Sequence, residues 1–147
     1  HLENLRPMVR DAAQYREDLF ETFDAVLLDV PCSGLGVMLE KPDVKYRHTP
    51  ESVADLVKLQ KQILDTCCAY VKKGGVLVYA TCSILPEENG DQMAAFLENH
   101  PEFSLDPLPE SIPEAFRQHC GPRGLQLLAH RDGVEGFFIA RLRKREG

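Results

Sequence analysis

Two apolar segments, each followed directly by a cysteine, constrain the fold of this chain more than any other feature. Residues 24–30 form a nearly continuous apolar run that leads into Cys32, and residues 75–81 form a second run that leads into Cys82. Such runs are typical of strands buried on both faces of a parallel sheet. Ligands bind at the carboxyl ends of the strands in open α/β sheets. The sequence therefore predicts that two strands deliver Cys32 and Cys82 to one edge of a sheet, as paired reactive groups over one substrate.

Helices are expected between and after these strands. Thr49 is followed by a proline and an acid, a combination that favours a helix start, and the apolar spacing extends the helix over 50–73. A second helix is predicted over 86–99. The glycine- and proline-containing segments 33–48 and 101–124 are expected to be irregular.

The order of elements predicts the fold class. Residues 125–130 and 136–143 resemble two strands joined by a short turn, which indicates an antiparallel hairpin. Residues 4–10 are a further strand candidate, suited to a sheet edge because they contain a proline. Strand, helix, strand, helix and hairpin together predict an α/β fold, the second half of a doubly wound Rossmann-like sheet with an antiparallel C-terminal hairpin. No glycine-rich turn precedes it, so we expect 1–147 to be a single domain that forms the C-terminal part of a larger one whose N-terminal cofactor-binding part is missing.

Composition narrows the class of protein. A net charge of −6 argues against a free-standing nucleic-acid-binding module, but not against an RNA enzyme whose basic surface lies elsewhere. The chain has five cysteines, and their spacing is not that of a disulfide-bonded scaffold. This favours reduced thiols and a cytoplasmic protein. Neither a membrane span nor a secretory leader is predicted, and the cysteine and histidine spacing predicts no metal site. Cys67 and Cys68 are interpreted as core residues and Cys120 as a loop thiol.

Five short motifs follow one another along the chain. They are Asp-Val-Pro-Cys-Ser-Gly at 29–34, Pro-Asp-Val-Lys at 42–45, Tyr-Ala-Thr-Cys-Ser at 79–83, Pro-Glu-Glu-Asn at 86–89 and Gly-Phe-Phe-Ile-Ala-Arg at 136–141. The ordered set resembles the C-terminal catalytic half of the Sun (Fmu) family of RNA methyltransferases. This resemblance implies a Rossmann-like methyltransferase fold, S-adenosylmethionine as cofactor, ribosomal RNA as partner, and 5-methylcytosine, in bacteria chiefly in 16S rRNA, as product.

The resemblance also implies roles for single residues. The family's Thr-Cys-Ser cysteine attacks carbon 6 of cytosine, which assigns nucleophilic catalysis to Cys82. The family's Pro-Cys cysteine assists release of the product, which assigns that role to Cys32. The acid before it contacts the polar edge of the base, a role that falls on Asp29. The Pro-Glu-Glu-Asn turn is implied to support the Cys82 loop, although Glu88 also suits a helix N-terminus for dipole reasons alone.

Cofactor and RNA contacts are implied in the same way. Asp29 and Pro31 are expected to border the cofactor, and Asp11 is expected near its adenine. Basic residues of the loop after the first cysteine are candidate contacts to RNA phosphates, although a solvated loop is equally consistent with Lys41, Lys45 and Arg47.

Departures from the family pattern leave alternatives open. The glycine-rich cofactor turn and the N-terminal RNA-binding domain are absent from this sequence, so we expect the segment to be inactive by itself. The loop at 38–41 has one basic residue where two arginines are common, and Glu135 stands where aspartate is usual. The main alternative is a non-catalytic interaction or scaffold module derived from a methyltransferase. A thiol redox protein would instead form a reversible Cys32–Cys82 disulfide, but the chain has no Cys-x-x-Cys.

Overall fold

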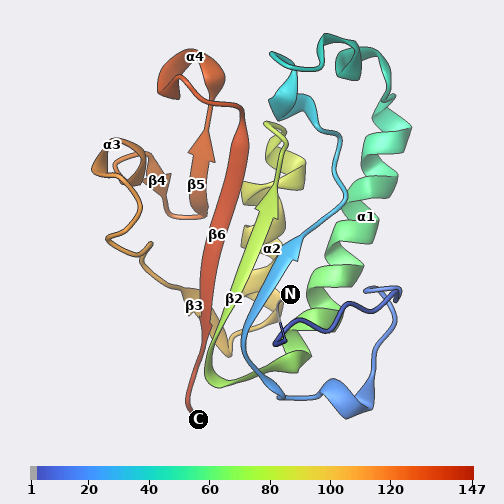
Figure 1. Ribbon diagram of the computed structural model, residues 1–147, viewed down its shortest axis with the longest axis vertical. Coiled ribbons are helices and arrows are strands. Elements are labelled where there is room, and N and C mark those ends of the chain that lie inside the picture. Colours follow the sequence, from blue (N-terminus) through green and yellow to red (C-terminus); the bar gives the residue numbers. More distant parts are fainter. Residues whose placement is uncertain (1–2) are drawn as a thin grey trace.

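A mixed sheet organises the computed structural model, which describes residues 3–147 (Figure 1). Its strands run in the order β1-β2-β6-β5-β4, and β3 pairs with another part of β6. The strands are β1 (Phe23–Asp29), β2 (Val71–Thr81), β3 (Phe103–Leu105), β4 (Cys120–Gly121), β5 (Gly124–Leu127) and β6 (Phe137–Lys144). The α-helices are α1 (Pro50–Cys67), α2 (Gly90–Asn99), α3 (Glu114–Arg117) and α4 (Ala129–Asp132). Short 3₁₀ turns are η1 (Glu17–Leu19), η2 (Leu35–Val37), η3 (Pro42–Tyr46), η4 (Cys68–Tyr70) and η5 (Pro86–Glu88).

The two predicted apolar strands are neighbours in this sheet. β1 and β2 pair in parallel, with Asp29 opposite Ala80 at their carboxyl ends, and α1 forms the crossover between them. The predicted hairpin is present as the antiparallel pair β5–β6, with the short helix α4 in its connection in place of a simple turn. The α/β class and the antiparallel C-terminal hairpin are therefore confirmed.

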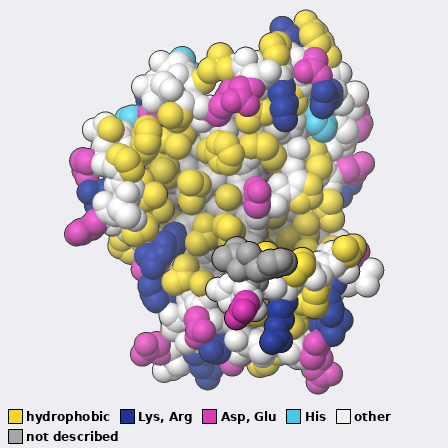
Figure 2. All heavy atoms as spheres, in the orientation of Figure 1, with side chains coloured by type: hydrophobic (Ala, Val, Ile, Leu, Met, Phe, Trp, Pro, Cys, Tyr) yellow, Lys and Arg dark blue, Asp and Glu magenta, His cyan; other side chains and the backbone are white. Residues whose placement is uncertain are grey.

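The main core lies between the sheet and the helices α1 and α2. Leu77 and Tyr79 of β2 are fully buried and belong to one apolar cluster with Leu64 of α1 and Met93 of α2. In Figure 1, α2 lies behind β2 and β6, and α1 runs beside β1 at the right of the sheet. Successive strand residues point to opposite faces, so Leu27 of β1, which is 70% exposed, lies on the other face. Figure 2 shows hydrophobic side chains gathered across the middle of that face.

Several predicted boundaries were wrong. The helix expected over 50–73 ends at Cys67, because Val71 already pairs with Phe23 and β2 begins there. The helix expected over 86–99 is divided into η5 and α2, since the backbone of Asn89 (φ −117°, ψ −102°) departs from helical values. Residues 4–10 carry no strand.

The segment expected to be irregular between α2 and the hairpin contains two short strands and a short helix. β3 pairs with the end of β6, a partner far away in the sequence. β4 pairs with β5, which follows it after a tight turn. Cys120 therefore lies in a short exposed strand and not in a loop. Among the described residues, no helix has the length and apolar character needed to cross a membrane.

Candidate active site

The carboxyl ends of β1 and β2 bring Cys32 and Cys82 into contact. The two Sγ atoms are 3.2 Å apart, and both thiols are free and half-buried. The strand pairing continues one residue beyond β1, where the Val30 N–H donates to the Ala80 carbonyl at 3.2 Å. Because both chains leave the sheet at the same level, the cysteines that follow them meet, as the parallel arrangement predicts.

The protonation of Cys32 is controlled by its surroundings. Burial, and secondarily the neighbouring sulfur of Cys82, raises the pKa of Cys32 to about 12, against a smaller opposing effect of the Gly34 backbone. Cys32 is therefore a neutral thiol at neutral pH, and its S–H can donate a hydrogen bond to the Cys82 sulfur.

A buried polar network lies beside the two cysteine loops. Glu88, which is 0% exposed, accepts hydrogen bonds from Ser33 and Ser83, the residues directly after the two cysteines. The Glu88 side chain thus faces inward and contacts the Cys82 loop, so the dipole of a helix N-terminus alone does not account for it. Gln60 of α1, which sequence reasoning did not single out, also donates to this carboxylate, at 2.9 Å. Its only sequence signal is a polar residue within the apolar stripe of α1.

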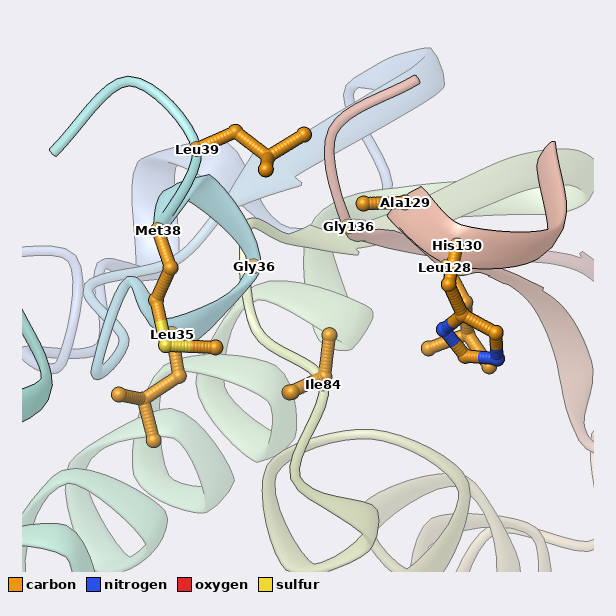
Figure 3. Close-up of a pocket in the computed structure, with 9 residues that line it drawn as sticks. All are labelled: Leu35, Gly36, Met38, Leu39, Ile84, Leu128, Ala129, His130 and Gly136. Atoms are coloured by element: carbon orange, nitrogen blue, oxygen red, sulfur yellow. The ribbon is translucent and has the colours of Figure 1, made fainter. Parts of the chain in front are cut away.

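An apolar cavity of about 350 Å³ borders the Cys82 loop on one side. Leu35, Met38 and Leu39 stand on one side of it, with Leu128 and His130 opposite and Ile84 between them (Figure 3). Cys32, Cys82 and Asp29 are not among its lining residues, which also include Gly36, Ala129 and Gly136. The cavity therefore adjoins the thiol pair without containing it.

Two glycines at this cavity fix the backbone of Cys82. The Gly36 N–H donates to the Cys82 carbonyl at 2.9 Å, and the Gly136 N–H donates to the Gly36 carbonyl at 2.8 Å. A Cβ on Gly36 would lie 2.0 Å from the Gly136 carbonyl oxygen. These three backbone segments approach each other so closely that a side chain at Gly36 has no room.

The predicted cofactor residues lie on exposed surface. Asp29 ends β1 and its carboxylate makes no hydrogen bond to another described residue, while the Pro31 carbonyl accepts from Gln60 at 3.0 Å. Asp11 accepts from the backbone of Ala13 at 2.9 Å and from Gln14 at 3.1 Å. Within residues 3–147 no hydrogen bond joins Asp11 to Asp29 or Pro31. Asp29 therefore lies at the same strand end as Cys32, whereas the hydrogen bonds of Asp11 stay within its own turn.

The predicted RNA-contacting residues occupy η3 and its flanks. Lys41 and Lys45 are exposed, and Lys45 Nζ lies 4.9 Å from the centroid of the Tyr46 ring. Arg47 forms an ion pair with Asp43, which compensates its charge. Their role toward RNA stays a prediction. In the described part of the chain, no three His, Cys, Asp or Glu side chains are grouped so that they could hold a metal ion.

Comparison with known proteins identifies the family. The family model described as 16S rRNA methyltransferase RsmB/F matches residues 1–143. The chain belongs to this family. The probable ribosomal RNA small subunit methyltransferase B of Bacillus subtilis (strain 168) is 44% identical over 126 residues, and its counterpart from Pasteurella multocida (strain Pm70) is 43% identical over 135 residues. These matches cover 85% and 90% of this chain, but the chain spans only 28% and 29% of the two relatives.

Solved structures agree with the family assignment and the fold. PH0851 is 35% identical with a TM-score of 0.84, over 95% of this chain and 31% of that protein. NSun6 from Pyrococcus horikoshii, solved with SFG, is 25% identical with a TM-score of 0.73, over 97% of this chain and 35% of that one. The resemblance to the Sun family and the Rossmann-like methyltransferase fold are thus confirmed.

Proposed function

We propose that this chain is the catalytic segment of an S-adenosylmethionine-dependent methyltransferase that modifies carbon 5 of cytosine in ribosomal RNA, in particular 16S rRNA. The observation that carries the proposal is the pair of free thiols, 3.2 Å apart, at the carboxyl ends of two parallel strands. Two cysteines so placed, in a chain of this family, supply one group for attack on the base and one for its release.

Carbon 5 of cytosine is a poor nucleophile, and the proposed role of Cys82 is to activate it. The Cys82 thiolate adds to carbon 6, which forms a carbon–sulfur bond and turns the ring into an enamine with a nucleophilic carbon 5. S-adenosylmethionine, when bound, supplies the electrophilic methyl group. The proton on carbon 5 then leaves to a base, the C5–C6 double bond forms again, and the electrons of the carbon–sulfur bond return to Cys82.

Cys32 and Asp29 have supporting roles in this proposed cycle. Cys32 is held as a thiol because burial and the Cys82 sulfur raise its pKa, so its S–H can stabilise the departing thiolate by a hydrogen bond. Asp29 offers an exposed carboxyl group at the end of β1, suited to the exocyclic amine and ring nitrogen of cytosine. A target base inside an RNA helix has to be flipped out to reach these groups.

The residues around the strand ends also suit the cofactor. An exposed carboxylate without a hydrogen-bond partner among the described residues is free to accept from an amino or hydroxyl group of a ligand, and Asp29 meets that condition. Asp29, Pro31 and Asp11 are the residues that would hold it. Because the chain spans 28% of its Bacillus relative, we assign the activity to the whole protein and expect residues 1–147 alone to be inactive.

A covalent-adduct gel tests the proposal. The longest natural chain containing this segment is incubated with 16S rRNA and S-adenosylmethionine, as wild type, Cys32→Ala and Cys82→Ala. We expect Cys32→Ala to accumulate a protein–RNA adduct and Cys82→Ala to form none. Cys120→Ala, which removes an exposed thiol from β4, is the matched control and should behave as wild type. RNA binding without any adduct in wild type and Cys32→Ala would favour the non-catalytic module.

A further inference from the structure

Glu88 is a fully buried acid to which the proposed reaction gives no part. It lies at the end of η5 and is 0% exposed. A buried carboxylate is costly unless its oxygens accept hydrogen bonds. Among the described residues Glu88 forms no ion pair, so its stabilisation comes from neutral hydrogen-bond donors.

Four donors converge on its two oxygens. Oε1 accepts from the Ser33 backbone N–H at 2.8 Å and from Gln60 Nε2 at 2.9 Å. Oε2 accepts from the Ser33 hydroxyl at 2.6 Å and from the Ser83 hydroxyl. The two hydroxyls are themselves 3.1 Å apart. The carboxylate therefore joins three segments, the loop after β1, the loop after β2 and the middle of α1.

The serine donors are the sequence neighbours of the two cysteines. Ser33 directly follows Cys32, and Ser83 directly follows Cys82. Gln60 also donates to the Pro31 carbonyl at 3.0 Å, so the first loop is held on both sides of its cysteine. The Glu88 side chain is thus hydrogen-bonded to the residue that follows each of the two cysteines.

We propose that Glu88 is a positioning residue that sets the spacing of the Cys32 and Cys82 sulfur atoms. This inference rests on the proposed function for its catalytic meaning, since that function needs both thiols over one base. A residue that only completes the core would affect stability alone. A positioning residue also controls how readily the two sulfurs meet.

Disulfide closure measures this spacing without RNA or cofactor. Oxidised glutathione converts the two thiols to a Cys32–Cys82 disulfide and is itself reduced to two molecules of glutathione, and non-reducing peptide mapping follows the rate. Closure depends on the effective concentration of one sulfur at the other. We compare wild type with Glu88→Leu and Glu88→Gln in the longest natural chain that contains the segment.

The two variants have opposite expectations. Leucine fills the volume of Glu88 but accepts no hydrogen bond, so Glu88→Leu should slow closure at least about 10-fold while the circular dichroism spectrum stays native. Glutamine keeps one accepting oxygen for the Ser33 N–H and Gln60, and its amide can donate to the two serine hydroxyls. Glu88→Gln should therefore close within about 3-fold of wild type. Glu87→Leu, at an exposed neighbouring position, is the matched control and should not differ from wild type.

Folded Glu88→Leu that closes the disulfide as fast as wild type overturns the proposal. If Glu88→Leu does not fold, Ser83→Ala decides the question, because it removes the hydroxyl that joins the carboxylate to the Cys82 loop, and unchanged closure would again overturn the proposal. The adduct gel with Cys32→Ala keeps the two proposals apart. A Glu88-dependent closure rate, together with RNA binding but no adduct in Cys32→Ala, supports positioning and refutes the proposed function.

Discussion

The close approach at Gly36 leads to a quantitative prediction for Gly36→Ala. The added Cβ would lie 2.0 Å from the Gly136 carbonyl oxygen and 2.7 Å from that of Cys82, whereas such contacts are essentially never shorter than 3.0 Å. The Gly136 carbonyl must therefore move by about 1 Å. Overpacking of this kind costs about 1–3 kcal/mol, and each backbone hydrogen bond lost at the bridge adds about 1 kcal/mol.

We expect Gly36→Ala to lower the free energy of unfolding by about 2–4 kcal/mol in urea denaturation. Gly121→Ala is the matched control, because the atom nearest to its added Cβ is a carbonyl oxygen at 3.9 Å, an ordinary contact. The control should change stability by less than about 0.5 kcal/mol. Equal stability of the two variants would refute the reasoning that the backbone bridge leaves no room.

The same substitution should also affect the thiol site. The Gly36 N–H holds the Cys82 carbonyl, so a shift of the bridge displaces the proposed nucleophile. A misplacement of about 1 Å can cost about 100-fold in rate. Adduct formation with RNA, measured in proteins that also carry Cys32→Ala, should slow to that extent in Gly36→Ala and not in Gly121→Ala. An unchanged rate of adduct formation in a destabilised Gly36→Ala variant would show that the backbone contacts of Gly36 affect stability but not the reaction of Cys82.

Three further predictions concern charge and protonation. The Arg131 guanidinium lowers the pKa of Asp132 from its ordinary value of 3.8 to about 2. The ionised carboxylate therefore stabilises the fold fully above about pH 4, and this stabilisation is lost as the pH falls toward 2. Asp132→Asn should therefore be less stable at pH 7 and show a shallower loss between pH 4 and 2 by circular dichroism, and an identical acid transition would contradict this. Cys82→Ala should lower the pKa of Cys32, because the substitution removes a sulfur atom that raises this pKa. The pH profile of iodoacetamide alkylation at Cys32 should therefore move to lower pH. An unchanged profile would mean that burial alone raises the pKa of Cys32. Lys144→Ala should cost about 2–3 kcal/mol in urea denaturation, since the buried ammonium donates to a backbone carbonyl at 2.9 Å and to a glutamate at 3.1 Å, and a loss below about 0.5 kcal/mol would count against that role.

Local chemistry made part of the fold predictable. Thr49 and Ser52 form a capping box, in which each side chain accepts from the backbone N–H of the other, and this explains why α1 starts where the sequence indicates. The end of α1 was not predictable in this way. Lys72 and Lys73 suit a helix C-terminus, but Lys72 pairs with Asp24 of β1 at 2.8 Å and both lysines extend β2. Pairing with a distant strand outweighed the local preference.

The candidate site was also predictable from the sequence only in part. Cys32 and Cys82 directly follow apolar strands, so their meeting could be predicted from the strand ends alone. Glu88 could not be recognised as buried, because an acid after a proline at the start of a helix is ordinarily exposed. Its burial depends on two serines and a glutamine from three other segments, which come together only when the sheet and α1 are complete.

The unequal support of β1 and β2 has a consequence for motion. The second half of β2 pairs with β1 on one side and with β6 on the other, over Val76–Ala80 and Val76–Thr81 respectively, whereas β1 pairs only with β2 among the described residues. Amide protons of 76–81 should accordingly exchange with solvent more slowly than those of 25–29, since edge strands open at lower free energy. Within the described residues, Cys82 therefore follows the strand that is paired on both sides, and Cys32 follows the strand that is paired on one side. In residues 1–147 studied by themselves, a fluctuation that separates the sulfurs should begin with the loop of Cys32.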